Sequence, residues 1–504
     1  MCIRDSIQIS ADGRISASGG WAAKGQAIAV QASQGMDLSG NVAARQVSLQ
    51  SQRDVVLRGG DVVADEQLSV NAGSLNDVGR SASDKAKRFG QTVSVTTTGA
   101  AAVQNATWGA QDSLTLSSGG NATLTDAQVY AKGALTANAA ALALNGSTQV
   151  SATGAAHVTT SGRTDIAAGS TLQGQAMVKV TAATLGNLGT VQGQSLQVVG
   201  TLDNGSTGTV ASASSLNLTG THLGNQGKVV ADTLTASTTT LTNSGTLQGR
   251  TVTLTQSGQL TNSGTVVATG SQAALSVQAG ALTNSGKLAS DGNTGVQAST
   301  TLQNSAGGQI TGQAIGMKAA QLSNSGLVHA AQALTVGDAN TQSLTNTSTG
   351  TLQGHSIDAQ AGTLSNQGKV RATQALTATS RQSALQNSSG ATMQGTSVML
   401  SGGLTNAGLI KAASDTAAAS QIFVRMDDLN TAWANQVGGR IESGGSIRLQ
   451  GQSGTQAGTL LALNDVALGD ATRALNTLNV SGSVISQSGR IDASTGAGLS
   501  LIHI

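Results

Sequence analysis

The side chains that could carry out catalysis or bind a metal are few and scattered along this chain. The histidines away from the chain ends are His157, His222, His329 and His355. None of them has a second His or a Cys at the spacing of a metal site. The adjacent carboxylates Asp427 and Asp428 would point to opposite faces of a strand, which makes them a poor acid–base pair. The sequence therefore predicts no enzyme activity, no catalytic residue, no metal and no cofactor.

The composition also differs from that of compact enzyme domains. Of 504 residues, 66 are Gly, none is Pro, 1% are aromatic and 10% are charged, whereas roughly 25% are charged in ordinary domains. A core with so few aromatic residues has to be filled by small aliphatic side chains in a narrow space. The net charge of +2 comes from scattered Lys and Arg residues, which predicts no nucleic-acid partner. Low charge with regularly recurring aliphatic residues is typical of a structure that repeats many times.

A five-residue pattern, Leu-x-Asn-x-Gly, recurs through the middle of the chain. Clear copies begin at Leu241, Leu260, Leu282, Leu322, Leu364 and Leu404. With the degenerate copies included, the repeated asparagines are Asn187, Asn204, Asn225, Asn243, Asn262, Asn284, Asn304, Asn324, Asn346, Asn366, Asn387 and Asn406. Their mean spacing is about 20 residues, which is typical of a solenoid and not of a propeller or a helical repeat.

Polar and apolar residues alternate within each repeat, as they do from Thr251 to Thr255. This period of two is that of a strand in which every second side chain faces inward. We therefore predict an all-β fold, a right-handed parallel β-helix (solenoid) with about 20 residues per coil and coils stacked about 4.8 Å apart. The handedness follows the usual rule for parallel crossovers.

Stacking of the coils would place the twelve asparagines above one another. We predict that they form a structural Asn ladder, in which the side-chain amide of each coil bonds to that of the next. Each asparagine is expected to adopt the left-handed conformation of a sharp turn, and the glycine two residues later to have a positive φ. Proline would remove a backbone donor from every coil, and the chain contains none.

The regularity of the repeat divides the chain into segments. Residues 7–183 are expected to form less regular coils, residues 184–412 the regular repeats, and residues 444–498 further coils. Residues 413–443 break the pattern and hold an unusual share of the aromatic residues. They are expected to be an irregular excursion, which is an irregular coil, a cap-like transition or a partner-binding segment.

A second departure from the pattern lies in residues 77–90, which are rich in charge. The basic residues there are Arg80, Lys85, Lys87 and Arg88. We expect a loop that leaves the coils, which is either simply solvated or a site for an acidic polysaccharide.

Both ends of the chain differ from the repeat. Residues 1–6 and 499–504 can be encoded by opposite strands of one short DNA sequence, which resembles the transposase end sequence used to prepare sequencing libraries. We therefore expect both hexapeptides to be translated adapter sequence. Cys2, the only cysteine, would then lie outside the native segment, which could contain no disulfide.

The sequence Leu-Thr-Asn-Ser-Gly, followed by Thr or Lys, an aliphatic residue and a short strand, resembles the repeats of filamentous haemagglutinins and the shafts of contact-dependent growth-inhibition exoproteins. The match is clear over residues 184–412 and looser elsewhere. The resemblance implies a fragment of a Gram-negative protein that an outer-membrane two-partner-secretion transporter exports to the cell surface. It further implies the structural shaft of a secreted adhesin, which acts in cell adhesion, biofilm formation or virulence through an unknown receptor on host or bacterial cells.

Three alternatives stay open on the sequence alone. The same repeats could form the stalk of a contact-dependent toxin-delivery protein, which would differ only beyond residue 498. A β-helix polysaccharide lyase or hydrolase would need clustered charged residues and aromatic side chains that stack on sugars, and this chain has only three Trp, two Phe and one Tyr. Other surface repeat proteins, including autotransporter passengers, are the third alternative.

Overall fold

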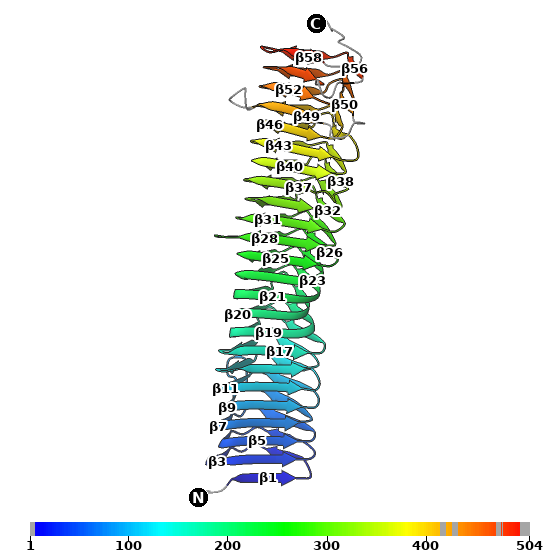
Figure 1. The fold of residues 1–504 in the computed structure, drawn as a ribbon. Helices are drawn as coiled ribbons and strands as arrows, with labels where there is room; N and C mark the ends of the chain where they lie inside the picture. The colour runs from blue at the N-terminus through cyan, green and yellow to red at the C-terminus, as the bar shows by residue number, and fades with distance from the viewer. Residues whose placement is uncertain (1–5, 414–419, 426–431, 470–474, 476, 494–504) are drawn as a thin grey trace. The chain divides into compact units, whose positions relative to one another are not determined.

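The computed structural model describes residues 6–413, 420–425, 432–469, 475 and 477–493. The chain consists of two compact units, Met1–Gly249 and Arg250–Ile504. Among the described residues, every element of regular secondary structure is a β-strand, and no helix long and apolar enough to cross a membrane occurs. The strands form about 22 coils of about 21 residues (Figure 1), which confirms the predicted all-β parallel solenoid.

A regular coil of the second unit contains three short strands. Each strand pairs in parallel with its counterpart in the next coil, so that the coils form three parallel sheets around one core. One such step joins β28 (Ala274–Ala279) to β31 (Asn293–Ala298), β29 (Ala281–Asn284) to β32 (Thr301–Asn304), and β30 (Lys287–Ser290) to β33 (Gln309–Gly312).

The middle strand of each coil from β26 to β50 ends on an asparagine. Besides β29 and β32, these strands are β26 (Gln259–Asn262), β35 (Gln321–Asn324), β38 (Ser343–Asn346), β41 (Thr363–Asn366), β44 (Leu385–Asn387), β47 (Leu404–Asn406) and β50 (Ala432–Asn435). The leucine two residues before the asparagine faces inward, and Leu282, Leu302 and Leu322 stack in register with at most 2% of each exposed. Identical positions of the repeat therefore lie above one another.

The first unit has the same parallel pairing, and several of its strands are longer, up to 17 residues in β19 and β21. The strands of this unit include β8 (Ser74–Val78), β9 (Ala86–Thr97), β11 (Ala106–Ser118), β13 (Gln128–Ala131), β16 (Gln149–Ala152), β18 (Arg163–Ile166), β19 (Thr171–Asn187), β20 (Thr190–Asn204), β21 (Thr209–Asn225) and β23 (Thr233–Asn243). β19 and β20 pair along most of their length, with irregularities after Gly174 and Thr181 where the coil bends.

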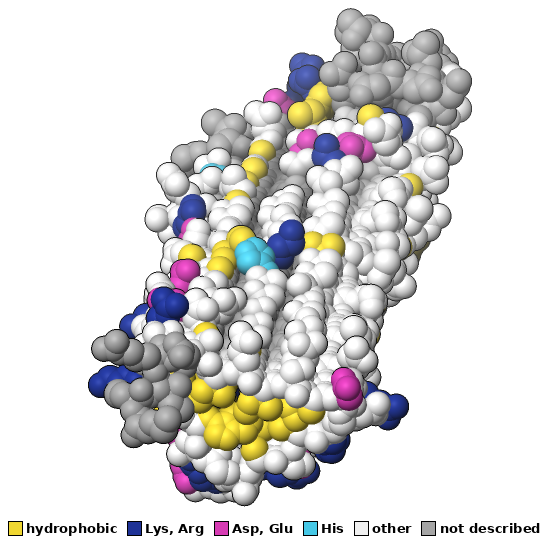
Figure 2. All heavy atoms as spheres, turned by 90° about the horizontal axis from the view of Figure 1, so that it is seen from below, with side chains coloured by type: hydrophobic (Ala, Val, Ile, Leu, Met, Phe, Trp, Pro, Cys, Tyr) yellow, Lys and Arg dark blue, Asp and Glu magenta, His cyan; other side chains and the backbone are white. Residues whose placement is uncertain are grey.

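The outer surface matches the low charge of the sequence. Small aliphatic side chains fill the core, and outward positions carry mostly Thr, Ser, Asn and Gln. Figure 2 shows one face on which most of the surface is backbone or uncharged polar side chain, with Lys, Arg, Asp and Glu scattered over it.

The charged loop expected over residues 77–90 is shorter in the structure. Asp77 belongs to β8 and Arg88 to β9, and only residues 79–85 connect the two strands outside regular secondary structure. The side chains of Asp77 and Arg88 are fully buried and form an ion pair of 2.5 Å. The expectation was wrong at these two positions because opposite charges inside the core neutralise each other, so that a charged pattern need not indicate a solvated segment.

The irregular excursion expected over residues 413–443 is described only in part. Its strands β49 (Gln421–Arg425), β50 and β51 (Arg440–Ser443) continue the three sheets in register. Residues 414–419 and 426–431, including Asp427 and Asp428, lie outside the described residues, as do residues 1–5 and the hexapeptide 499–504. The described part is therefore a coil of the solenoid.

Candidate functional site

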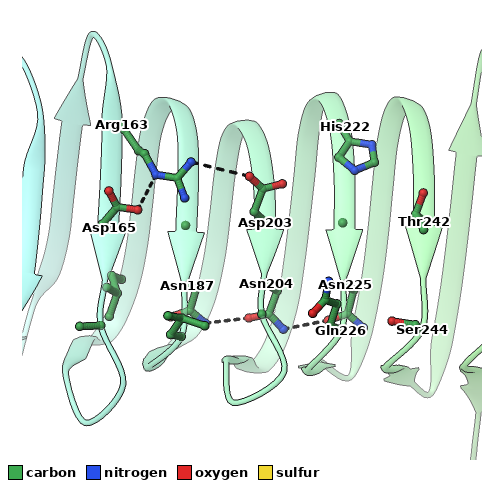
Figure 3. Close-up of a pocket in the computed structure, with 16 residues that line it drawn as sticks. Arg163, Asp165, Asn187, Asp203, Asn204, His222, Asn225, Gln226, Thr242 and Ser244 are labelled. Atoms are coloured by element: carbon green, nitrogen blue, oxygen red, sulfur yellow. Dashed lines mark hydrogen bonds and ion pairs between the residues drawn. The ribbon is translucent and has the colours of Figure 1, made fainter.

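The twelve asparagines of the predicted ladder all lie inside the coils. The first unit contains Asn187, Asn204, Asn225 and Asn243, and the second contains Asn262, Asn284, Asn304, Asn324, Asn346, Asn366, Asn387 and Asn406. Within each unit, Nδ2 of one asparagine donates to Oδ1 of the next at 2.7–2.9 Å. Figure 3 shows three consecutive members in line. At most 2% of each residue is exposed.

Apart from its bond to the next asparagine, each side-chain amide also donates to a backbone carbonyl oxygen at the turn of its own coil or of the next coil. Nδ2 of Asn284, for example, also donates to the carbonyl oxygens of Gly286 and Gln309, both at 3.2 Å. Burying a side-chain amide without hydrogen-bond partners would lower the free energy of unfolding by about 1–3 kcal/mol. The ladder avoids this loss because it gives the buried amides hydrogen-bond partners. The arrangement fixes the register of neighbouring coils and offers no group for chemistry on a substrate.

The ladder in the second unit extends beyond the predicted residues. Asn406 donates to Asn435 at 2.8 Å, and Asn435 donates to Oε1 of Gln456 at 3.0 Å. Gly439 follows Asn435 at the same spacing as Gly308 follows Asn304. This spacing could have identified Asn435 as a ladder residue from the sequence. Gln456 is followed by Gly458 at the spacing of the clear copies, but Gln stands in the place of Asn.

In the first unit the ladder begins at Asn187. This residue is aligned with Ile166 of the preceding coil, which has no side-chain donor. Oδ1 of Asn187 is accordingly buried without a hydrogen-bond partner.

The predicted backbone conformations of the repeat were wrong. The non-glycine residues with positive φ in the described chain are Asn105, Asp126 and Gln272, and none belongs to the ladder. Glycines two residues after a ladder asparagine, such as Gly326 and Gly368, do not have positive φ either. Their role is close approach, because a Cβ at Gly326 would overlap the carbonyl oxygen of Gly308 in the preceding coil.

Substitution of this glycine tests the explanation. Gly326→Ala is expected to lower the free energy of unfolding by about 1–3 kcal/mol, because adding a Cβ forces two backbones apart. Gly316→Ala is the matched control, because Gly316 lies in a strand and an added Cβ would have no atom within 4 Å. We expect this variant to have an unchanged or slightly higher free energy of unfolding. Urea unfolding of the two variants checks this, and equal effects would contradict the close-approach explanation.

A surface groove of about 590 Å³ crosses the coils from β18 to β23 in the first unit (Figure 3). Its outward residues are aligned by strand register in the order Asp165, Gly186, Asp203, Gly224 and Thr242. The glycines have no side chain and form the floor of the groove. This surface, which we call the Arg163 groove, brings several charged groups together outside the core, as does the cluster of Arg80 with Asp61 and Asp84.

The charged side chains of the Arg163 groove are paired with one another. Nε of Arg163 donates to Asp165 at 2.5 Å, and its Nη1 lies 3.8 Å from the carboxylate of Asp203. Nδ1 of His222 lies 2.8 Å from the hydroxyl of Thr240. Since one guanidinium contacts both carboxylates, the groups form a clasp across coils and not a free acid–base pair.

The same arrangement occurs nearer the N-terminus. Arg14 donates two hydrogen bonds, of 3.0 and 2.9 Å, to the carboxylate of Asp54, which lies 40 residues further along. The pair spans Gly35 of the intervening coil, just as the pair of Arg163 and Asp203 spans Gly186. The same contact therefore occurs twice in this unit: an arginine pairs with an aspartate two coils ahead and passes over a glycine of the coil between.

The Arg14–Asp54 clasp predicts a pH dependence of stability. The hydrogen bonds from Arg14 hold the pKa of the Asp54 carboxyl below its ordinary value of 3.8. A carboxyl with a lowered folded-state pKa stabilises the protein above its unfolded-state pKa, and this contribution is lost as the pH falls through the folded-state value. We expect Arg14→Gln to reduce stability at pH 6 and to have little effect near pH 2.5. Urea unfolding at both pH values measures this, with the exposed Lys24→Gln as control, and an equal loss at both would contradict it.

The remaining histidines do not form a centre. His157 and His329 take outward strand positions aligned with Lys179 and Gln353, and Nδ1 of His355 lies 3.0 Å from the hydroxyl of Thr373. In the part of the chain that the structure describes, no group of three or more His, Cys, Asp or Glu residues could hold a metal ion.

No protein-family model, no curated protein and no solved structure matches this chain. The fold is therefore established by strand pairing and burial, and the family resemblance depends on the repeat pattern.

Proposed function

We propose that this chain is the non-enzymatic shaft of a secreted, surface-displayed adhesin of the filamentous haemagglutinin type, acting in cell adhesion or biofilm formation. The observation that supports the proposal best is the in-register stacking of the Leu-x-Asn-x-Gly repeat, with its asparagines bonded from coil to coil. In such a solenoid backbone pairing joins each coil to the coils beside it, so length grows with the number of coils. That property suits a spacer that projects a binding end away from a cell.

Two features of the sequence fit export of an unfolded chain through an outer-membrane two-partner-secretion transporter, the partner that we propose. Residues 7–498 contain no Cys, so no disulfide could form before export. The chain contains no Pro, so folding outside the cell includes no slow proline isomerisation.

The second candidate function is the stalk of a contact-dependent growth-inhibition protein, for which these repeats would be equally suitable. Long-read sequencing of the source DNA in both directions distinguishes the two. A secretion domain upstream and a transporter gene nearby, without a toxin, would support the adhesin. The same genes with a downstream toxin and immunity gene would support the stalk, and a fused catalytic module without a transporter would overturn both.

A deletion in the complete gene tests the spacer role itself. Removal of residues 285–304 deletes one coil and joins Asn284 to Ser305, which keeps a ladder asparagine before the same turn. We expect normal surface display and adhesion, because the stacking is preserved. The matched deletion of residues 285–294 breaks the register, and we expect it to abolish display. Equal behaviour of the two deletions would count against a shaft made of interchangeable coils.

A further inference from the structure

An aromatic pair lies on the outside of the first unit, where most outward positions are small or polar. Phe89 and Tyr130 come from β9 and β13, two coils apart, and both are aligned with Gly109 of the coil between them. Their rings meet edge to face, with centroids 6.0 Å apart and an angle of 62°. The chain has only two Phe and one Tyr, so placing two of these three residues on the outer face requires an explanation.

The glycine between the two rings lets the tyrosine lie against the sheet. A Cβ at Gly109 would come within 2.5–2.8 Å of Cζ, Oη and Cε1 of Tyr130, so the ring covers the bare backbone there. Both aromatic side chains remain partly exposed. The result is an aromatic platform on the surface.

The same outward position continues into a hollow lined by amides. From Tyr130 the register runs through Ser151, Gln173 and Gln192 to Ala211. Gln192 donates to Gln173 at 3.0 Å, and the two border an open hollow of about 420 Å³. No charged side chain lines this hollow. From Phe89 to Ala211 the surface, which we call the aromatic–glutamine column, crosses six coil steps, or about 29 Å at the usual strand spacing.

We infer that the aromatic–glutamine column binds a neutral polysaccharide. The C–H face of a sugar packs on an aromatic ring, and sugar hydroxyls exchange hydrogen bonds with amide side chains, which both donate and accept. The uncharged hollow favours a neutral chain, and the length of the column suits several sugar units in a row. The inference rests on the proposed adhesin function and adds that the shaft itself, not only a distal end, contacts a glycan.

Gel retardation and titration calorimetry of the whole purified chain test this, with dextran and galactomannan as neutral probes and heparin as the anionic one. We expect a neutral probe to bind, and the double substitution Gln173→Ala/Gln192→Ala to raise its Kd at least tenfold. Tyr130→Leu should act similarly while still covering Gly109, which separates loss of the stacking ring from loss of folding. The control is Gln321→Ala, an exposed outward glutamine of the second unit, which should leave the Kd unchanged.

Three outcomes would overturn the inference. The first is binding of heparin alone, which would point to Lys87 beside Phe89 as an anion site. The others are no binding of either neutral probe, and binding of a neutral probe that none of the column variants weakens. Failure here leaves the proposed shaft function intact, because that function is decided separately by the genes that flank this segment.

Discussion

Replacing Asn324 by alanine is expected to lower the free energy of unfolding of the second unit by about 2–3 kcal/mol. The substitution removes the hydrogen bonds of 2.8 Å from Asn304 and 2.9 Å to Asn346. It also removes the bonds from Asn324 to the carbonyl oxygens of Gly326 and Thr351, on either side of the coil boundary. Each buried polar group that loses its partner costs about 1–3 kcal/mol, since water cannot replace the bond.

The loss should be local as well as large. Backbone pairing joins each coil only to the coils beside it, so amide protons of the coils near Asn324 are expected to exchange faster with solvent while those of distant coils change little. Hydrogen exchange followed by mass spectrometry gives this map, and urea unfolding gives the free energy. Asn293→Ala is the matched control, because Asn293 is exposed on an outward strand position of the same unit. If Asn324→Ala were no more harmful than Asn293→Ala, the ladder would not stabilise the fold.

The repeat could be predicted from sequence because its chemistry is periodic. Leucine and asparagine at fixed spacing fill equivalent positions, and the period of two marked the strands. Asn435 was missed because the coil spacing lengthens there, and because Trp433 takes the inward position that leucine has in the preceding coil, where it is aligned with Leu404. Gln456 was missed because a different residue type performs the same role in hydrogen bonding.

The features that could not be predicted depend on which coils become neighbours. The glycines of the repeat suggested positive φ, but the close approach of Gly326 to Gly308 exists only once coils are stacked. The clasp of Arg14 with Asp54 and the meeting of Phe89 with Tyr130 each skip one coil. A single sequence shows no period for such contacts, because they occur at irregular places and depend on a glycine in the coil between.

The buried ion pair of the first unit gives the largest expected effect of a single substitution. Arg88→Leu should destabilise this unit by about 3–5 kcal/mol, the cost of leaving a buried charge without its partner. Asp77 would keep the hydrogen bond of 2.8 Å from Nε1 of Trp108 but lose its ion pair with Arg88. The double variant Asp77→Leu/Arg88→Leu is the control, and we expect it to recover part of the loss, since apolar residues of similar volume often replace buried pairs without cost, while Nε1 of Trp108 loses its acceptor.

The effect of Arg88→Leu should depend on pH with a definite sign. Burial raises the pKa of the Asp77 carboxyl, while the charge of Arg88 and the hydrogen bonds from Arg88 and Trp108 oppose that rise. Without Arg88 the folded-state pKa is expected to rise further above the unfolded-state value, so the folded state holds more protons and stability falls as the pH increases through this interval. The variant should therefore be closest to wild type near pH 3 and weakest at pH 7 and above, as measured by urea unfolding. A penalty that is constant with pH, or that the double variant shares in full, would mean that these residues act through packing and not through their charges.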